Sequence, residues 1–141
     1  MENSEKEPTV LFKFRQAMDA GDAAEVMKML HNEIAVDVDF GGGVRPLHLA
    51  VQQGPDEIVQ ILIAQGADPD AVTESGWTAL HTAALMGNLE TAQVLIDHGA
   101  TLNIANDLGH RPIDLARAHK RQSMISLLDK AGKKPWQFWK K

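Results

Sequence analysis

The sequence predicts an all-α fold in which short helix–turn–helix units stack into a solenoid and hairpin-like loops join the units. Two observations predict it. Glycines recur every 33 residues in three separate series, and apolar residues recur at spacings of three and four inside each period. The three series are Gly43, Gly76 and Gly109; Gly66, Gly99 and Gly132; and Gly21, Gly54 and Gly87. Three series with one spacing indicate a structural repeat.

Each period begins with a short helix. The segment "RPLHLAVQQG" places apolar residues at Leu47, Ala50 and Val51, which is the spacing of one helical face. The same positions return in the neighbouring periods. The repeated residues are Leu47, Leu80 and Ile113, and Ala17, Ala50, Ala83 and Ala116. A first helix is therefore expected in every unit.

A longer second helix follows the first. In "PDEIVQILIAQG", Pro55 stands in the first turn with acidic residues behind it, which is typical of a helix start. Ile58, Ile61 and Leu62 form its apolar stripe. Gly66 is expected to end the helix in the left-handed conformation, and the next period repeats this pattern up to Gly99. The linking segments "ADPDAVTESG" and "ATLNIANDLG" are rich in turn-forming residues.

Three hexapeptides in one register carry a resemblance to a known family. "RPLHLA" (45–50), "TALHTA" (78–83) and the weaker "RPIDLA" (111–116) resemble the Thr-Pro-Leu-His-x-Ala motif that opens the first helix of an ankyrin repeat. The likeness extends over about residues 10–132. It implies one ankyrin-repeat domain, residues 1–132, followed by a basic aromatic tail, residues 133–141. The four expected repeats are about 8–40, 41–73, 74–106 and 107–132.

His48 and His81 stand one period apart, so they are interpreted as parts of the scaffold. The resemblance implies that His81 is hydrogen-bonded to Thr78 and ties the loop to the first helix. His48 has Arg45 in the threonine position and so lacks that hydroxyl partner. In the last repeat, Arg111 and Asp114 occupy the threonine and histidine positions and are expected to pair with each other.

The first repeat carries Glu33 where the other repeats have glycine. Its second helix is therefore expected to end in a different shape. Terminal repeats are atypical because one of their faces meets water instead of a neighbour.

Composition limits the function. The net charge is −5, with 5 Lys/Arg and 16 Asp/Glu in residues 1–106 (−11) and 9 and 3 in residues 107–141 (+6). An acidic body argues against a general nucleic-acid binder, which would present a broad basic face. No cysteine, secretory signal or long apolar run is present, so a cytoplasmic protein is expected. A monomeric state is also predicted.

No catalytic, cofactor or metal site is predicted. "FGGGVR" lacks the Gly-Lys-Ser/Thr of a phosphate loop, and "DVD" and "DPD" lack the calcium-loop pattern. His110 and His119 have no obvious third ligand and are interpreted as surface residues. An enzyme remains a minor alternative.

The resemblance implies that a protein partner binds the hairpin tips and the inner face of the first helices. Positions that vary between periods are free of the stack, so these are predicted to contact the partner. They are Val44, Gln52, Gln53, Glu74, Ser75, Trp77, Leu85, Met86, Asp107, Leu108, His110 and His119.

Three of these positions form the expected centre of the site. Trp77, Leu85 and Met86 are large apolar residues at positions that should be wet, which is typical of an interface. The alternative is that Trp77 lies flat on a neighbouring repeat. The acidic residues Glu74 and Asp107 favour a partner with basic character.

The tail "KKPWQFWKK" is not explained by the repeat pattern. Its aromatic residues, Trp136, Phe138 and Trp139, leave three hypotheses open. The tail covers the exposed flank of the last repeat, or it is a linear motif for a protein, or it enters an anionic membrane surface.

One modification is also implied by resemblance. Asn103 follows Leu95 by eight residues, which is similar to the site that an asparaginyl hydroxylase modifies in some eukaryotic ankyrin repeats.

Overall fold

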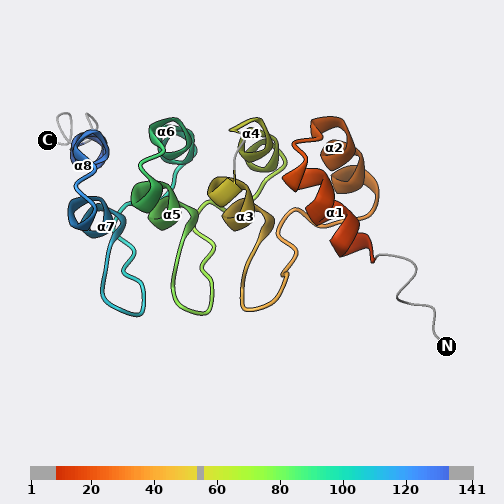
Figure 1. The fold of residues 1–141 in the computed structure, drawn as a ribbon, viewed down its shortest axis with the longest axis horizontal. Helices are drawn as coiled ribbons and strands as arrows, with labels where there is room; N and C mark the ends of the chain where they lie inside the picture. Colours follow the sequence, from red (N-terminus) through yellow and green to blue (C-terminus); the bar gives the residue numbers. More distant parts are fainter. Residues whose placement is uncertain (1–8, 54–55, 134–141) are drawn as a thin grey trace, which may run out of the picture. The chain divides into compact units, whose positions relative to one another are not determined.

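The structure, a computed structural model, describes residues 9–53 and 56–133. Within these ranges the chain forms eight α-helices and no strand. They divide between two compact units, Met1–Asp68 and Pro69–Lys141, each of which holds two helix pairs. Within each unit, the two helix pairs lie side by side (Figure 1).

Unit 1 contains α1 (Val10–Asp19), α2 (Ala23–Asn32), α3 (Pro46–Gln53) and α4 (Asp56–Ala64). Helix α1 packs against α2 and α3, and α4 packs against α2 and α3. Side chains cap the first two helices, because the oxygens of Thr9 and Asp22 accept backbone N–H groups at 3.1 Å. The loop between α2 and α3 is fixed to the core by Phe40, whose ring stacks on buried Phe14 with centroids 6.4 Å apart.

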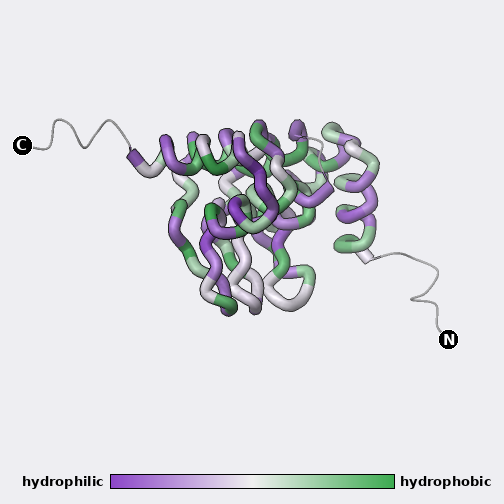
Figure 2. The backbone as a smooth tube through the Cα atoms, turned by 60° about the vertical axis from the view of Figure 1, so that its left-hand side comes forward, coloured by the Kyte–Doolittle hydropathy of each residue, from purple (hydrophilic) through white to green (hydrophobic). Residues whose placement is uncertain are grey.

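Unit 2 contains α5 (Ala79–Met86), α6 (Leu89–Asp97), α7 (Pro112–Ala118) and α8 (Gln122–Ala131). Helix α5 lies beside α7 and α6 beside α8, with the loops running out from the α5 and α7 layer (Figure 1). Leu80, Leu95 and Met124 are fully buried between the layers. Figure 2 shows hydrophobic and hydrophilic stretches alternating along the helices, as expected where each helix buries one face.

The predicted fold class is confirmed. Each expected repeat contains one of the observed helix pairs, although the domain limits of 1–132 and 133–141 remain a prediction. Pro55, the expected start of α4, lies outside the described residues. Glu33, the residue after helix α2, has φ −134°, so this end does differ from the glycine stops that follow α4 and α6.

The predicted glycine stops at Gly66 and Gly99 are confirmed, since both are left-handed, with φ +97° and +93°. Gly132, one period after Gly99, differs and has φ −69° after α8. No helix within the described ranges has the length and apolar character needed to cross a bilayer.

The left-handed stop at Gly99 can be tested by substitution. A Cβ added there meets no atom within 4 Å, so the only cost of Gly99→Ala is the backbone conformation. We expect a loss of about 1–2 kcal/mol in the free energy of unfolding. Gly99→Asn should lose less, because asparagine tolerates this conformation better. Urea unfolding measures both, and equal midpoints for Gly99→Ala and wild type would contradict the expectation.

Candidate functional site

The candidate site rests on buried His81. The Thr78 N–H donates to His81 Nδ1 at 3.0 Å, and the His81 N–H donates to Thr78 Oγ1 at 3.2 Å. The hydroxyl of Thr78 also lies 2.9 Å from Nδ1. The predicted Thr78 partner is therefore confirmed. In unit 1 the Arg45 N–H donates to His48 Nδ1 at 2.9 Å, so that histidine is held by backbone instead of a hydroxyl.

His81 also fastens the following loop. Because Nδ1 accepts the Thr78 N–H, the neutral ring carries its proton on Nε2, which donates to the carbonyl of His110 at 2.8 Å. The sequence did not predict this bond, because a backbone carbonyl 29 residues away leaves no side-chain pattern. His81 thus joins two successive loops of unit 2.

Side chains fix the shape of each hairpin tip. Thr73 Oγ1 accepts the N–H groups of Ser75 and Trp77, both at 3.3 Å. One period later, Asn106 Oδ1 accepts those of Leu108 and His110 at 2.9 and 3.0 Å. These local bonds satisfy exposed backbone donors. The tips of unit 2 are therefore ordered before any partner arrives.

The two tips of unit 2 touch. The Asp107 N–H donates to the Ser75 carbonyl at 3.0 Å. Gly76 has φ +80°, and a Cβ added there would lie 3.1 Å from the Asn106 Cα, so glycine permits the close approach. We call the resulting patch the tip surface. It consists of Glu74, Ser75, Trp77, Asp107, Leu108 and His110.

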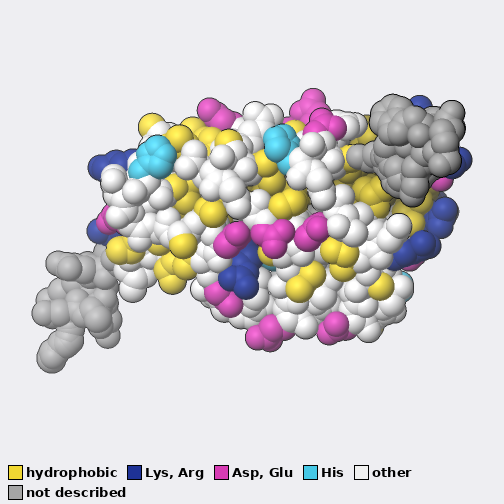
Figure 3. Space-filling model, turned by 180° about the vertical axis from the view of Figure 1, so that it is seen from behind, with side chains coloured by type: hydrophobic (Ala, Val, Ile, Leu, Met, Phe, Trp, Pro, Cys, Tyr) yellow, Lys and Arg dark blue, Asp and Glu magenta, His cyan; other side chains and the backbone are white. Residues whose placement is uncertain are grey.

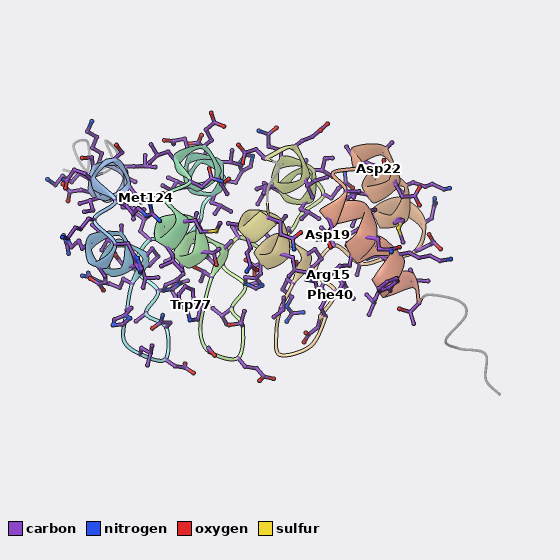
Figure 4. The ribbon with its side chains drawn as sticks, in the orientation of Figure 1. Arg15, Asp19, Asp22, Phe40, Trp77 and Met124 are labelled. Carbon is purple, nitrogen blue, oxygen red and sulfur yellow. The ribbon has the colours of Figure 1, made fainter. Side chains whose placement is uncertain are left out.

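The tip surface joins exposed polar residues to apolar ones. Leu108 is 74% exposed, and Glu74 and Asp107 are exposed too. Trp77, which Figure 4 labels, is half-buried. Its ring centroid lies 5.4 Å from that of His81, and the two ring planes are tilted by 54°. It therefore contacts a histidine of its own repeat. That these residues bind a partner stays a prediction.

A second group of predicted residues lies where α5 and α7 end. Leu85 is half-buried, Met86 is 45% exposed, and His119 is exposed at the end of α7. Arg121 Nε donates to the Leu85 carbonyl at 3.1 Å and so links the two helix ends. We call Leu85, Met86 and His119 the helix-end surface.

The remaining candidates belong to unit 1. Val44 is half-buried in the loop before α3, and Gln52 and Gln53 are exposed at the end of α3. They hold positions in unit 1 equivalent to members of the two surfaces above. The tail residues Trp136, Phe138 and Trp139 lie outside the described residues.

Sequence reasoning missed four exposed apolar residues. Val72, in the loop that carries the tip surface, is 44% exposed. Its equivalents one period away are Asp39 and Ala105, so the position varies and could have been found by the same rule. The other missed residues are Val10 (40%), Phe12 (52%) and Leu89 (39%).

The charges of unit 2 are grouped. Lys and Arg side chains gather at the end that carries α7 and α8 (Figure 3). Here the predicted pair is confirmed, with Arg111 Nε and Nη2 donating to the Asp114 carboxylate at 3.1 Å. The hydrogen bond from the Arg111 side chain, followed by that from its backbone N–H, lowers the pKa of Asp114 to about 2.

Within residues 9–53 and 56–133, no group of three His, Asp or Glu side chains could hold a metal ion.

Asp39 Oδ1 accepts the N–H groups of Gly41 and Gly43 at 2.7 and 3.2 Å. The Asp39 side chain therefore fixes the turn formed by the segment "FGGGVR".

Comparison with known proteins identifies the family. The family model described as "Ankyrin repeats (3 copies)" matches residues 47–137. The chain belongs to the ankyrin-repeat family. An ankyrin repeat protein of fowlpox virus (strain NVSL) is 39% identical over 66 residues, which are 46% of this chain and 15% of the viral protein.

Of two further relatives, one matches a longer segment of this chain than the viral protein does, and the other a shorter one. The mouse (Mus musculus) protein phosphatase 1 regulatory subunit 27 is 38% identical over 96 residues, 67% of this chain and 62% of the mouse protein. A glycerophosphocholine phosphodiesterase of Schizosaccharomyces pombe (strain 972 / ATCC 24843) is 52% identical over 42 residues, 30% of this chain and 4% of the yeast protein. The matched segments therefore span less than two thirds of each relative. Ankyrin repeats generally mediate protein–protein interaction.

The burial of the His81 ring predicts a pH dependence of stability. Burial lowers its pKa below the ordinary value of 6.5, although bonds to the backbone carbonyls of His110 and Ile104 oppose this. The folded protein thus favours the neutral ring, and stability is lost as pH falls through 6.5, where the unfolded chain takes up the proton. In NMR titrations, we expect the His81 ring to titrate at a lower pH in the folded chain than in urea. An equal or higher midpoint in the folded chain would contradict this.

The Arg111–Asp114 pair predicts a second pH effect. Because the folded pKa of Asp114 is lowered, its contribution is present above 3.8 and is lost as pH falls toward about 2. The pair is partly exposed, at 43% and 29%, so we expect Asp114→Asn to cost only about 1 kcal/mol at neutral pH.

The measurement is urea unfolding of wild type and Asp114→Asn across this pH range. The difference between them should shrink toward zero at the acid end. A constant difference from neutral pH to pH 2 would show that the lost stability does not come from the charged pair.

Proposed function

We propose that the chain is a non-enzymatic adaptor or inhibitor that binds a protein partner through the concave face of its repeats. The tip surface is the proposed centre. The observation that carries the proposal is Leu108, 74% exposed on a tip whose backbone Asn106 holds fixed. A large apolar side chain held in water by an ordered loop is suited to filling a partner's pocket. The name of the mouse relative, a regulatory subunit, fits this role.

The charge of the tip surface supports a partner with basic character. Glu74 and Asp107 are exposed, and the bond between Asp107 and Ser75 keeps the two tips together. Acidic groups beside an apolar anchor favour a basic protein surface and reject an acidic one. Their long-range effect would mainly raise the association rate at low salt.

The helix-end surface is proposed to extend the contact. Met86 offers a flexible apolar side chain that adapts to irregular partners. Leu85 and His119 stand beside it, on helix ends that Arg121 links. Val44, Gln52 and Gln53 are proposed as the equivalent contributions of unit 1. A monomeric state and a cytoplasmic location are part of the same proposal.

A membrane-peripheral role is the alternative. It is favoured by the grouping of Lys and Arg over α7 and α8, at the end of unit 2 from which the basic aromatic tail starts (Figure 3). Each lysine or arginine near an anionic surface contributes about 1 kcal/mol.

The partner surface is tested by capture from cell lysate with full-length baits. We expect Leu108→Asp and the double variant Trp77→Ala with Met86→Ala to lose a partner that the wild type retains. For the purified partner, Leu108→Asp should weaken binding by about tenfold or more, because an apolar anchor is replaced by a charge. Circular dichroism confirms that each bait is folded.

Leu89→Asp is the matched control, since Leu89 is exposed on α6, outside both surfaces. Equal loss with Leu89→Asp and Leu108→Asp would refute the tip surface. Binding to anionic vesicles that disappears in the variant Trp136→Ala with Trp139→Ala, without any protein partner, would favour the membrane alternative.

A further inference from the structure

Carboxylates join each loop to the next in a regular ladder. In unit 1, Asp37 Oδ2 accepts the Asp68 N–H at 3.2 Å. In unit 2, the Asp70 carboxylate accepts the N–H of Thr101 at 2.7 Å and its hydroxyl at 2.6 Å. The acceptors Asp37 and Asp70 are one period apart, and so are the donors. The ladder therefore follows the repeat.

One more period leads to a step that the described residues do not complete. The next acceptor position is Asn103 and the next donor position is Lys134, the first residue of the chain after the described range. Asn103 is exposed, and its amide oxygen can accept a backbone N–H as a carboxylate does. The ankyrin match also continues past Lys134, to residue 137.

A cavity lies beside this position on the flank of the last repeat. Its volume is about 280 Å³, and Gly132 and Lys133 are among the residues that line it. We call it the flank cavity. The lining residues that matter are Leu102, Asn103, Arg111, Ile113, Arg117 and Leu128. Apolar side chains with two guanidinium groups form a surface on which aromatic rings pack well.

We propose that residues 134–141 of this chain dock in the flank cavity in the register of the preceding loops. The Lys134 N–H donates to Asn103 Oδ1, and Trp136 covers the apolar lining. Trp136 is three residues beyond Lys133, which lines the cavity, so an extended chain lets it reach positions up to about 10 Å from Lys133. Docking removes both the ring and the lining from water. The flank cavity and the tail share no residue with the tip surface.

Gly132 is the hinge of this arrangement. The loops that complete the ladder leave left-handed glycines, Gly66 and Gly99, whereas Gly132 has φ −69°. Docking in the same register requires Gly132 to become left-handed, which glycine does without steric cost. An alanine fits the described conformation, because its Cβ meets no atom closer than 3.5 Å. It would oppose the docked one.

The test uses the fluorescence of Trp136 and Trp139 in the full chain carrying Trp77→Phe. We expect emission to the blue of the urea-unfolded chain, with weak quenching by acrylamide. Lys134→Pro removes the donor N–H, so it should shift emission to the red and raise quenching, whereas the matched variant Lys134→Ala should not. In an Asn103→Ala background, Lys134→Pro and Lys134→Ala should give the same emission wavelength and the same quenching by acrylamide.

Two further variants test the cavity and the hinge. Ile113→Asp and Gly132→Ala should each release the tail, whereas Leu89→Asp should not, with circular dichroism confirming the helices. The proposal is overturned if the folded Trp77→Phe chain, with Lys134 unchanged, emits at the same wavelength as the urea-unfolded chain. A blue shift that depends on protein concentration, or that needs anionic vesicles, overturns it in favour of a second copy or a membrane.

Discussion

The loops of unit 2 depend on hydrogen bonds that cross from one repeat to the next. Apolar burial holds the helices together, but it is non-directional and does not fix where a loop points. The bond from His81 Nε2 to the His110 carbonyl supplies that direction. The bonds between Asp70 and Thr101 and between Asp107 and Ser75 join the same two loops at other points along their length. Together they set the position of the tip surface.

Much of the fold could be predicted because it depends on side chains that repeat. The 33-residue period located every helix pair, and the motif at 78–83 located the Thr78–His81 bond. The partner carbonyl of His81 could not be predicted, because every residue has a carbonyl. Gly132 could not be distinguished from Gly99 either. A glycine permits both conformations, so its place in the period does not select one.

The candidate site was less predictable, since variation between periods shows only that a position is free of the stack. It does not show exposure. Leu108 and Met86 are exposed as expected, whereas Trp77 is half-buried and has its ring beside that of His81. Val72 was missed although it obeys the same rule, because it lies before the hairpin tip, at a distance from the helix motif. Burial of a side chain on its own repeat needs the three-dimensional path of the loop.

Ordered tips lower the conformational entropy that is lost when a partner binds. A flexible loop must lose conformational freedom when it binds, and that loss subtracts from affinity. In unit 2, Thr73 and Asn106 already satisfy the tip N–H groups, and His81 holds the loop from within. Leu108 is therefore exposed on a backbone that loses little conformational entropy on binding. Such an arrangement favours rigid recognition of a partner surface, and it depends on the hydrogen bonds that Thr73, Asn106 and His81 make.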